Sequence, residues 1–243
     1  DVAEKTIFEY ADIKGEALAV PVSNINPYLV DAPDLVLEKR NQPICIVPTI
    51  SYGSMANDDG HLLLDKEQRN ALIAAEPATA PYIRRYMGAQ EFLNNAERWC
   101  LWLKDISPSL MRSSNELRHR IEAVRKFRAS SNREATRNLA ATPSLFGEDR
   151  QPLKSYLLLP KVSSENRPYM PIGFMPSEVI ANGSALTISD SGHYEMGVLQ
   201  SKMHMAWMRA VAGRMKSDYQ YSAQIVYNNF PWPDIPEKLE PNQ

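Results

Sequence analysis

Short apolar runs bounded by Pro, Gly or Asn recur along the chain and predict buried strands. They lie at Leu18–Val22, Ile44–Val47, Leu62–Leu64, Arg98–Leu103, Tyr156–Leu159, Met170–Phe174 and Ala185–Ile188. Stretches with helical spacing of apolar residues fall between these runs in irregular order. The pattern therefore predicts an α+β fold, with mixed sheets and packed helices.

Helical spacing outside the basic part of the chain predicts a helix over Lys66–Ala75, ended before Pro77, and one or two short helices within Tyr82–Asn94. The segment Ser201–Gly213 is apolar nearly all round, which is typical of a buried helix. Its expected core residues are Met203, Trp207, Ala210 and Val211.

Near the end of the chain, Tyr227–Pro233 carries aromatic residues around prolines at alternate positions. Proline fixes the backbone in an extended form, so this segment could be a ligand for an SH3-type domain or a strap that closes over the core. We favour the strap.

A basic segment runs from Met111 to Asn138 and differs from the rest of the chain in charge. It holds eight Arg and Lys residues against three Glu, in a chain whose formal net charge is −2. Ser113-x-x-Glu116 and Ser131-x-x-Glu134 match the capping box that begins a helix. Two solvated amphipathic helices would explain the pattern. The dominance of arginine over lysine favours a face that contacts phosphates, because the planar guanidinium binds phosphate through two hydrogen bonds.

Composition bounds the class of protein. Of 243 residues, 44% are hydrophobic and 23% are charged, which excludes a fully disordered chain and allows one large domain or two small ones. No apolar stretch is long enough to span a membrane, and two cysteines without a CxxC motif indicate neither a disulfide framework nor a zinc site. A reduced, cytoplasmic setting fits best.

Glycine spacing argues against several enzyme classes. The ten glycines form no GxG, GxSxG or P-loop motif, although Rossmann-type loops need such glycines to let the backbone approach a cofactor. The four histidines are scattered without ligand spacing. We therefore assign no catalytic residue, no metal ligand and no cofactor site to this chain.

Several longer motifs point together to one family. They are Tyr52–Met55, Glu97–Leu103, Leu159–Arg167, Pro171–Phe174, His204–Trp207, Tyr221–Ser222 and Tyr227–Pro233. In this order they resemble the target-recognition region of MmeI-like type II restriction-modification DNA adenine methyltransferases. The resemblance covers nearly the whole chain.

The resemblance implies a domain that recognises a sequence in duplex DNA on behalf of a catalytic domain that methylates adenine N6 with S-adenosylmethionine. That catalytic domain carries a glycine-rich loop and an Asn-Pro-Pro-Tyr/Phe motif, and this chain has neither GxG nor Pro-Pro. We therefore expect residues 1–64 to be a strand-rich lead-in from an upstream methyltransferase domain, residues 65–236 to be the target-recognition domain, and residues 237–243 to be a tail. The expected partners are double-stranded DNA and that upstream domain, with no membrane.

Phosphate contacts would fix the register of such a domain on the duplex, and a few side chains would read base edges. The expected phosphate contacts are Arg125, Arg128, Arg133, Arg137, Lys154 and Lys161. Ser163, Ser164 and Arg167, in a loop between two strands, are expected to read bases. An ion pair between Glu165 and Arg167 that merely holds the loop is an equal alternative.

Lys216 and Asp218 form the sharpest candidate for base readout. Two residues apart on an extended segment, they would point the same way. Lysine donates to guanine O6 and N7 while aspartate accepts from cytosine N4, so the pair could read both bases of one G·C pair. In the resembling family, charged residues at this place are linked to base choice. Surface decoration is the alternative.

Two other classes stay open. An RNA-binding module would explain the arginines, but neither an aromatic stacking platform nor a GXXG loop is evident. A protein-interaction module would explain the Trp and Pro content.

Overall fold

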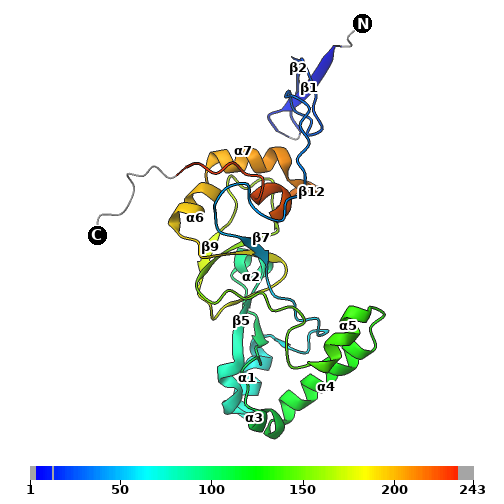
Figure 1. Ribbon diagram of the computed structural model, residues 1–243, viewed down its shortest axis with the longest axis vertical. Helices are drawn as coiled ribbons and strands as arrows, with labels where there is room; N and C mark the ends of the chain where they lie inside the picture. The colour runs from blue at the N-terminus through cyan, green and yellow to red at the C-terminus, as the bar shows by residue number, and fades with distance from the viewer. Residues whose placement is uncertain (1–3, 13, 235–243) are drawn as a thin grey trace, which may run out of the picture.

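The computed structural model describes residues 4–12 and 14–234. Figure 1 shows an elongated molecule with a two-stranded hairpin at one end and the helices α1, α3, α4 and α5 toward the other. The hairpin joins β1 (Lys5–Tyr10) and β2 (Ala17–Val22), which pair antiparallel with each other and with no further strand of the described chain.

The central sheet has four antiparallel strands in the order β3-β11-β7-β9. They span Ile50–Tyr52 (β3), Ala185–Ser189 (β11), Tyr156–Pro160 (β7) and Gly173–Met175 (β9). Every residue of β7 is buried, as expected for an apolar run in the middle of a sheet. Helices α6 (His193–Leu199) and α7 (Lys202–Val211) lie beside this sheet and contribute to its core.

A second four-stranded sheet has the order β10-β5-β6-β4 and lies toward the end of the molecule away from the hairpin. It consists of β10 (Ile180–Ala181), β5 (Ile83–Met87), β6 (Trp99–Leu101) and β4 (Leu63–Leu64). One pair, β10 with β5, is parallel, and the other two pairs are antiparallel. Mixed pairing together with the helices confirms the α+β prediction.

A third, small sheet has the order β12-β13-β8 and pairs antiparallel throughout. Its strands are β12 (Gly213–Met215), β13 (Asp218–Gln220) and β8 (Val162–Ser163). The remaining helical elements are α1 (Lys66–Ala75), α2 (Ala89–Asn94), α3 (Pro108–Ser113), α4 (Asn115–Ala129), α5 (Glu134–Asn138), two 3-10 turns at Pro77–Tyr82 and Leu139–Ala141, and a π-helical turn at Ala223–Tyr227.

Local signals predicted some helices closely. The prediction of Lys66–Ala75 is confirmed, and Asp65 caps this helix by accepting a hydrogen bond from the Gln68 N–H. The basic helix begins one residue later than predicted, because Ser114 rather than Ser113 is its N-cap. The Ser131 box is wrong as a cap, since Arg133 occupies the N-cap of α5 without a side-chain hydrogen bond.

The buried face of α7 was predicted correctly only in part, since Trp207 and Val211 pack against the core as expected. Met203 is 56% exposed and Ala210 is also exposed, while His204, Met205 and Met208 face the core. His204 Nε2 lies 3.0 Å from the Tyr221 hydroxyl, and burial lowers the pKa of His204 to about 4. The imidazole is therefore neutral near pH 7 and acts as a core side chain.

The strap prediction for Tyr227–Pro233 is consistent with the structure. Tyr227, Phe230 and Trp232 are buried in the core between α7 and the central sheet. The predicted strand Ile44–Val47, in contrast, has no strand pairing. Strands β3 and β4, from the predicted lead-in, pair with β11 and β6 of the later region.

Gly53 follows β3 where the chain crosses another backbone segment. A β-carbon added there would lie 2.2 Å from the Asn182 carbonyl oxygen, which is too close for any side chain. We expect Gly53→Ala to lower the free energy of unfolding by about 1–3 kcal/mol through overpacking, measured by urea denaturation. Gly197→Ala is the matched control, because a β-carbon in α6 would meet no atom within 4 Å. The control should be neutral or slightly stabilising, and equal losses in both variants would contradict the explanation.

Candidate nucleic-acid interface

The small β12-β13-β8 sheet brings together two segments that the sequence predicts as base-reading elements. Pairing of Tyr219 with Ser163 and of Gln220 with Val162 joins β13 to β8. The loop after β8 contains Ser164 and Arg167, and the turn between β12 and β13 contains Lys216. The two segments lie about 50 residues apart in sequence, so only this main-chain pairing makes them neighbours.

The backbone around Lys216 differs from the prediction. Met215 pairs with Asp218, so Lys216 and Ser217 form a two-residue hairpin turn rather than part of an extended segment. Lys216 has a φ of 57°, in the left-handed region that turn positions require. Lys216 is exposed and Asp218 is half-buried. Strand alternation therefore does not place the Lys216 and Asp218 side chains on the same face of the sheet.

Ser163 is a second correction. It is only 2% exposed, and its hydroxyl oxygen is buried without a hydrogen-bond partner among the described residues. Ser163 lies opposite Tyr219 in the sheet and its side chain is buried, so it does not reach a base edge in this arrangement. Ser164 and Arg167 remain half-exposed. The alternative role of Glu165 changes as well, since its carboxylate lies 4.0 Å from Arg214 and no pairing with Arg167 is found in the described chain.

Arg128 is the clearest correction among the predicted phosphate contacts. The residue is completely buried, and all five of its N–H donors are satisfied by backbone carbonyl oxygens. The acceptors belong to Ala56, Asn57, Leu139, Thr142 and Leu145, at 2.7–3.0 Å. Burial lowers the pKa of Arg128, and the carboxylate of Asp58 opposes that shift. Arg128 joins α4 to two loops and has no donor left for DNA.

The other predicted phosphate contacts on α4 and α5 are exposed. Arg125 pairs with Glu122 at 3.7 Å, and Arg137 donates to the Ser131 carbonyl at 2.9 Å. Arg133 is exposed at the start of α5. Figure 1 shows α4 and α5 well separated from β12 along the long axis, so these arginines do not share one site with Lys216.

Lys154 and Lys161 differ in their freedom to bind an anion. Lys154 is exposed beside Asp190, with 3.7 Å between the charged atoms. Lys161 donates to the Gly183 carbonyl at 2.8 Å and lies over the ring of Tyr52, 4.7 Å from its centroid. Burial and the neighbouring Arg150 lower the pKa of Lys161. Its ammonium group therefore already makes a hydrogen bond and a cation–π contact within the chain.

Sequence reasoning missed two arginines that share one tryptophan. The guanidinium carbons of Arg69 and Arg85 lie 5.1 and 5.7 Å from the ring centroid of Trp99. Neither guanidinium has an ion-pair partner within the described residues. Two positive charges held by one indole favour an anion beside them. No sequence signal could have found this group, because its members come from α1, β5 and β6.

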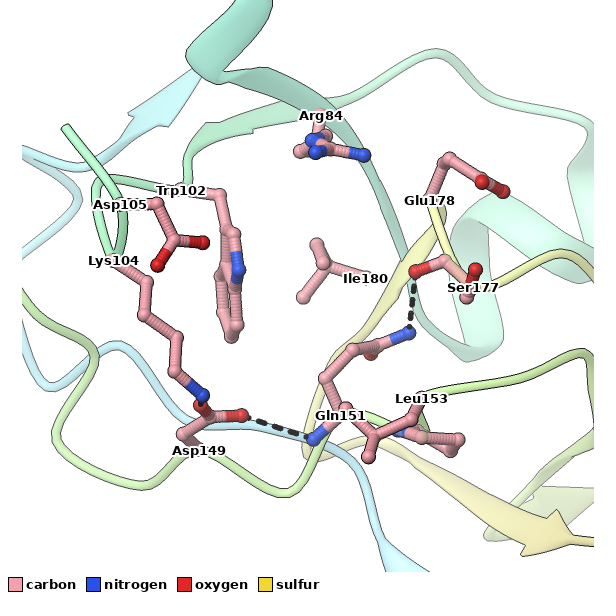
Figure 2. A pocket seen from close by; sticks show the side chains of 11 residues that line it. Arg84, Trp102, Lys104, Asp105, Asp149, Gln151, Leu153, Ser177, Glu178 and Ile180 are labelled. Carbon is pink, nitrogen blue, oxygen red and sulfur yellow. Dashed lines mark hydrogen bonds and ion pairs between the residues drawn. The ribbon is translucent and has the colours of Figure 1, made fainter.

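The structure also contains a polar cavity of about 300 Å³ between β5, β10 and the loop before β7. Figure 2 shows Lys104 directed at Asp149 across one side, with Arg84 and Glu178 on the other. The Lys104 ammonium lies 2.8 Å from the Asp149 carboxylate, and Gln151 is bound to the Ser177 carbonyl. Lys104 and Gln151 are thus paired with neighbouring groups, whereas the buried Nε of Arg84 has no hydrogen-bond partner among the described residues.

Two kinds of feature are absent from the described residues. These residues contain no group of three or more His, Cys, Asp and Glu residues placed to hold a metal ion. Within the same part of the chain, no helix has the length and apolar character needed to cross a membrane.

Comparisons with known proteins agree on one family. A family model for the MmeI target recognition domain matches residues 31–234. DNA methyltransferase A of Bacillus subtilis (strain 168) is 37% identical over 214 residues, which are 88% of this chain and 24% of that protein. A solved structure of the type IIL restriction-modification enzyme MmeI in complex with DNA has a TM-score of 0.91 and 44% identity, covering 98% of this chain and 32% of that one.

This chain thus spans about a quarter to a third of the length of these relatives. The order of motifs, the α+β fold and the family match agree, and they confirm the resemblance drawn from the sequence. The chain belongs to the family of MmeI target recognition domains.

Proposed function

We propose that this chain recognises a specific sequence in duplex DNA. The observation that carries the proposal is its likeness, at 44% identity and a TM-score of 0.91, to the structure of MmeI in complex with DNA. The β12–β13 turn and the loop after β8 are the proposed base-reading elements, with Lys216, Asp218, Ser164 and Arg167 as the reading residues. Arg125, Arg133, Arg137 and Lys154 are proposed phosphate contacts, and Arg69 and Arg85 join them.

We further propose that the chain serves as the specificity part of an S-adenosylmethionine-dependent adenine-N6 methyltransferase or restriction-modification enzyme in the cytoplasm. Its relative in Bacillus subtilis is named a DNA methyltransferase, and this chain corresponds to 24% of it. The glycines of this chain offer no cofactor loop of the usual kind. Its own residues therefore bind and orient DNA, and no step of methyl transfer is assigned to them.

The direct test is binding of the chain to a randomised duplex pool across a salt series, with sequencing of the bound fraction. An enriched motif, with affinity falling steeply as salt rises, is the expected result. Salt-dependent binding without a motif would contradict sequence reading by this chain alone. Binding to structured RNA in preference to duplex DNA would favour an RNA-binding module. No nucleic-acid binding at low salt would favour a protein-interaction module.

Substitutions of the two arginines around Trp99 test the phosphate contacts. If each contacts one phosphate, Arg69→Gln with Arg85→Gln should lower the slope of log affinity against log salt by about 1.8, equally for all sequences. Arg98→Gln is the control, because Glu91 already lies 3.7 Å from the Arg98 guanidinium. An unchanged slope in the double variant, with a reduced slope in Arg125→Gln and Arg133→Gln, would remove Arg69 and Arg85 from the phosphate contacts and leave those on α4 and α5.

A further inference from the structure

We propose that Arg214 is a positioning residue that holds the Lys216–Ser217 turn and the loop after β8 in one fixed arrangement. This inference rests on the proposed function and deepens it, because it says what aligns the base-reading side chains. Arg214 lies on β12, next to the turn, and is itself exposed at the edge of the small sheet.

Three contacts of one guanidinium group carry the proposal. Arg214 Nη1 donates to the Ser217 carbonyl oxygen at 2.9 Å. The guanidinium carbon lies 3.9 Å from the ring centroid of Tyr219, which is stacking distance. The same Nη1 lies 4.0 Å from the Glu165 carboxylate. The group therefore contacts the turn, the following strand and the neighbouring loop at once.

The contact with Ser217 stabilises an uncommon backbone conformation. Lys216 has a φ of 57° without being glycine, and such a residue keeps this conformation only where its surroundings determine it. The hydrogen bond from Arg214 to the Ser217 carbonyl adds a side-chain contact to the turn. Without that bond, the two turn residues could sample other conformations, and the backbone that carries the Lys216 side chain would no longer be fixed.

The contact with Glu165 extends the same constraint to the second reading segment. Tyr219 is buried and pairs with Ser163, so the ring under the guanidinium is fixed to β8. Glu165, two residues after Ser163, is half-buried beside Arg214. The Arg214 guanidinium thus makes its hydrogen bond, its stacking contact and its ion pair within the protein.

Two variants separate positioning from charge. Arg214→Ala removes all three contacts, while Arg214→Lys keeps the charge but loses the planar group that stacks on Tyr219 and reaches Ser217 and Glu165 together. Binding of the full chain and of each variant is measured on the randomised duplex pool used above. Both variants should lose base preference at the position read by the turn by about fivefold or more, the lower end of what one good base contact supplies. Affinity for unselected duplex and its salt slope should not change.

The control is Arg209→Ala, which removes an exposed arginine of α7 five residues away. It should leave the motif, the affinity and the midpoint of thermal unfolding as they are. The midpoint of the Arg214 variants is also measured, and it should stay close to that of the unchanged chain, since only the edge of a small sheet is altered.

Each contrary result has a distinct meaning. Full base preference in Arg214→Lys would show that charge alone suffices and would overturn positioning. Lower affinity for every sequence, with a shallower salt slope, would make Arg214 a phosphate contact and also overturn it. An unchanged motif in both variants would remove the inference and leave the proposed function intact. If the unchanged chain enriches no motif, both fail together.

Discussion

Arg128→Ala is expected to lower the free energy of unfolding by about 3–5 kcal/mol, because buried hydrogen bonds from a charged group are lost and a large side chain leaves a cavity. The substitution removes a hydrogen bond from each of five buried backbone carbonyl oxygens. Those of Ala56, Leu139 and Thr142 keep a backbone N–H donor, whereas those of Asn57 and Leu145 have no other donor among the described residues. It also opens a cavity between α4 and the loops that contain Asn57 and Thr142. The loss should appear as a lower midpoint in urea denaturation, with little change in slope.

Two control variants make this prediction specific. Arg125→Ala lies one turn earlier on the same helix, is exposed, and should change stability by less than about 0.5 kcal/mol. Arg128→Lys keeps a charge but offers three donors from one point, so it should recover only a small part of the loss. If Arg128→Ala were as stable as Arg125→Ala, the five hydrogen bonds would not hold the loops in solution.

The exchange of Lys216→Asp with Asp218→Lys should change the preferred base at one position of the recognised sequence. The two side chains differ in what they bind, since lysine donates to guanine and aspartate accepts from cytosine, and the exchange reverses their order along the turn. Discrimination of about 1–3 kcal/mol, or roughly 5- to 150-fold, should be lost for the original base and gained for another. Sequencing of bound duplexes from a randomised pool measures both changes.

A matched exchange elsewhere controls for charge. Lys154→Asp with Asp190→Lys also swaps an exposed lysine and an aspartate that lie within 3.7 Å, and it leaves the net charge unchanged. That variant should keep the original motif. An unaltered motif after the exchange at Lys216 and Asp218 would show that these residues do not read bases. They would then be surface charges without a role in recognition.

Elements with a strong local signal were predictable from sequence. The helix Lys66–Ala75 has a capping box and a following proline, and the strand Tyr156–Leu159 is a continuous apolar run, so both are specified by residues close in the chain. The motifs that identified the family are also short continuous segments, so they could be recognised without knowledge of the fold.

Features set by distant residues were not predictable. Arg128 looks like its exposed neighbours in sequence, and its burial depends on carbonyls contributed by residues 56–57 and 139–145. Ser163 is buried because β13 pairs beside it. Lys216 sits in a turn because β12 and β13 fold onto each other, although the local sequence Lys-Ser lacks the usual glycine or asparagine. In each case, tertiary contacts override a local pattern.

The small β12-β13-β8 sheet has a consequence for how specificity can evolve. Its strands are joined through main-chain pairing, which does not depend on the side chains at Lys216 and Asp218. Mutations at these positions can therefore accumulate at little cost to folding, and under the proposed base readout each would change the groups offered to the duplex. Drift at a few codons of one hairpin would then be enough to give sister lineages different target sequences on an unchanged scaffold.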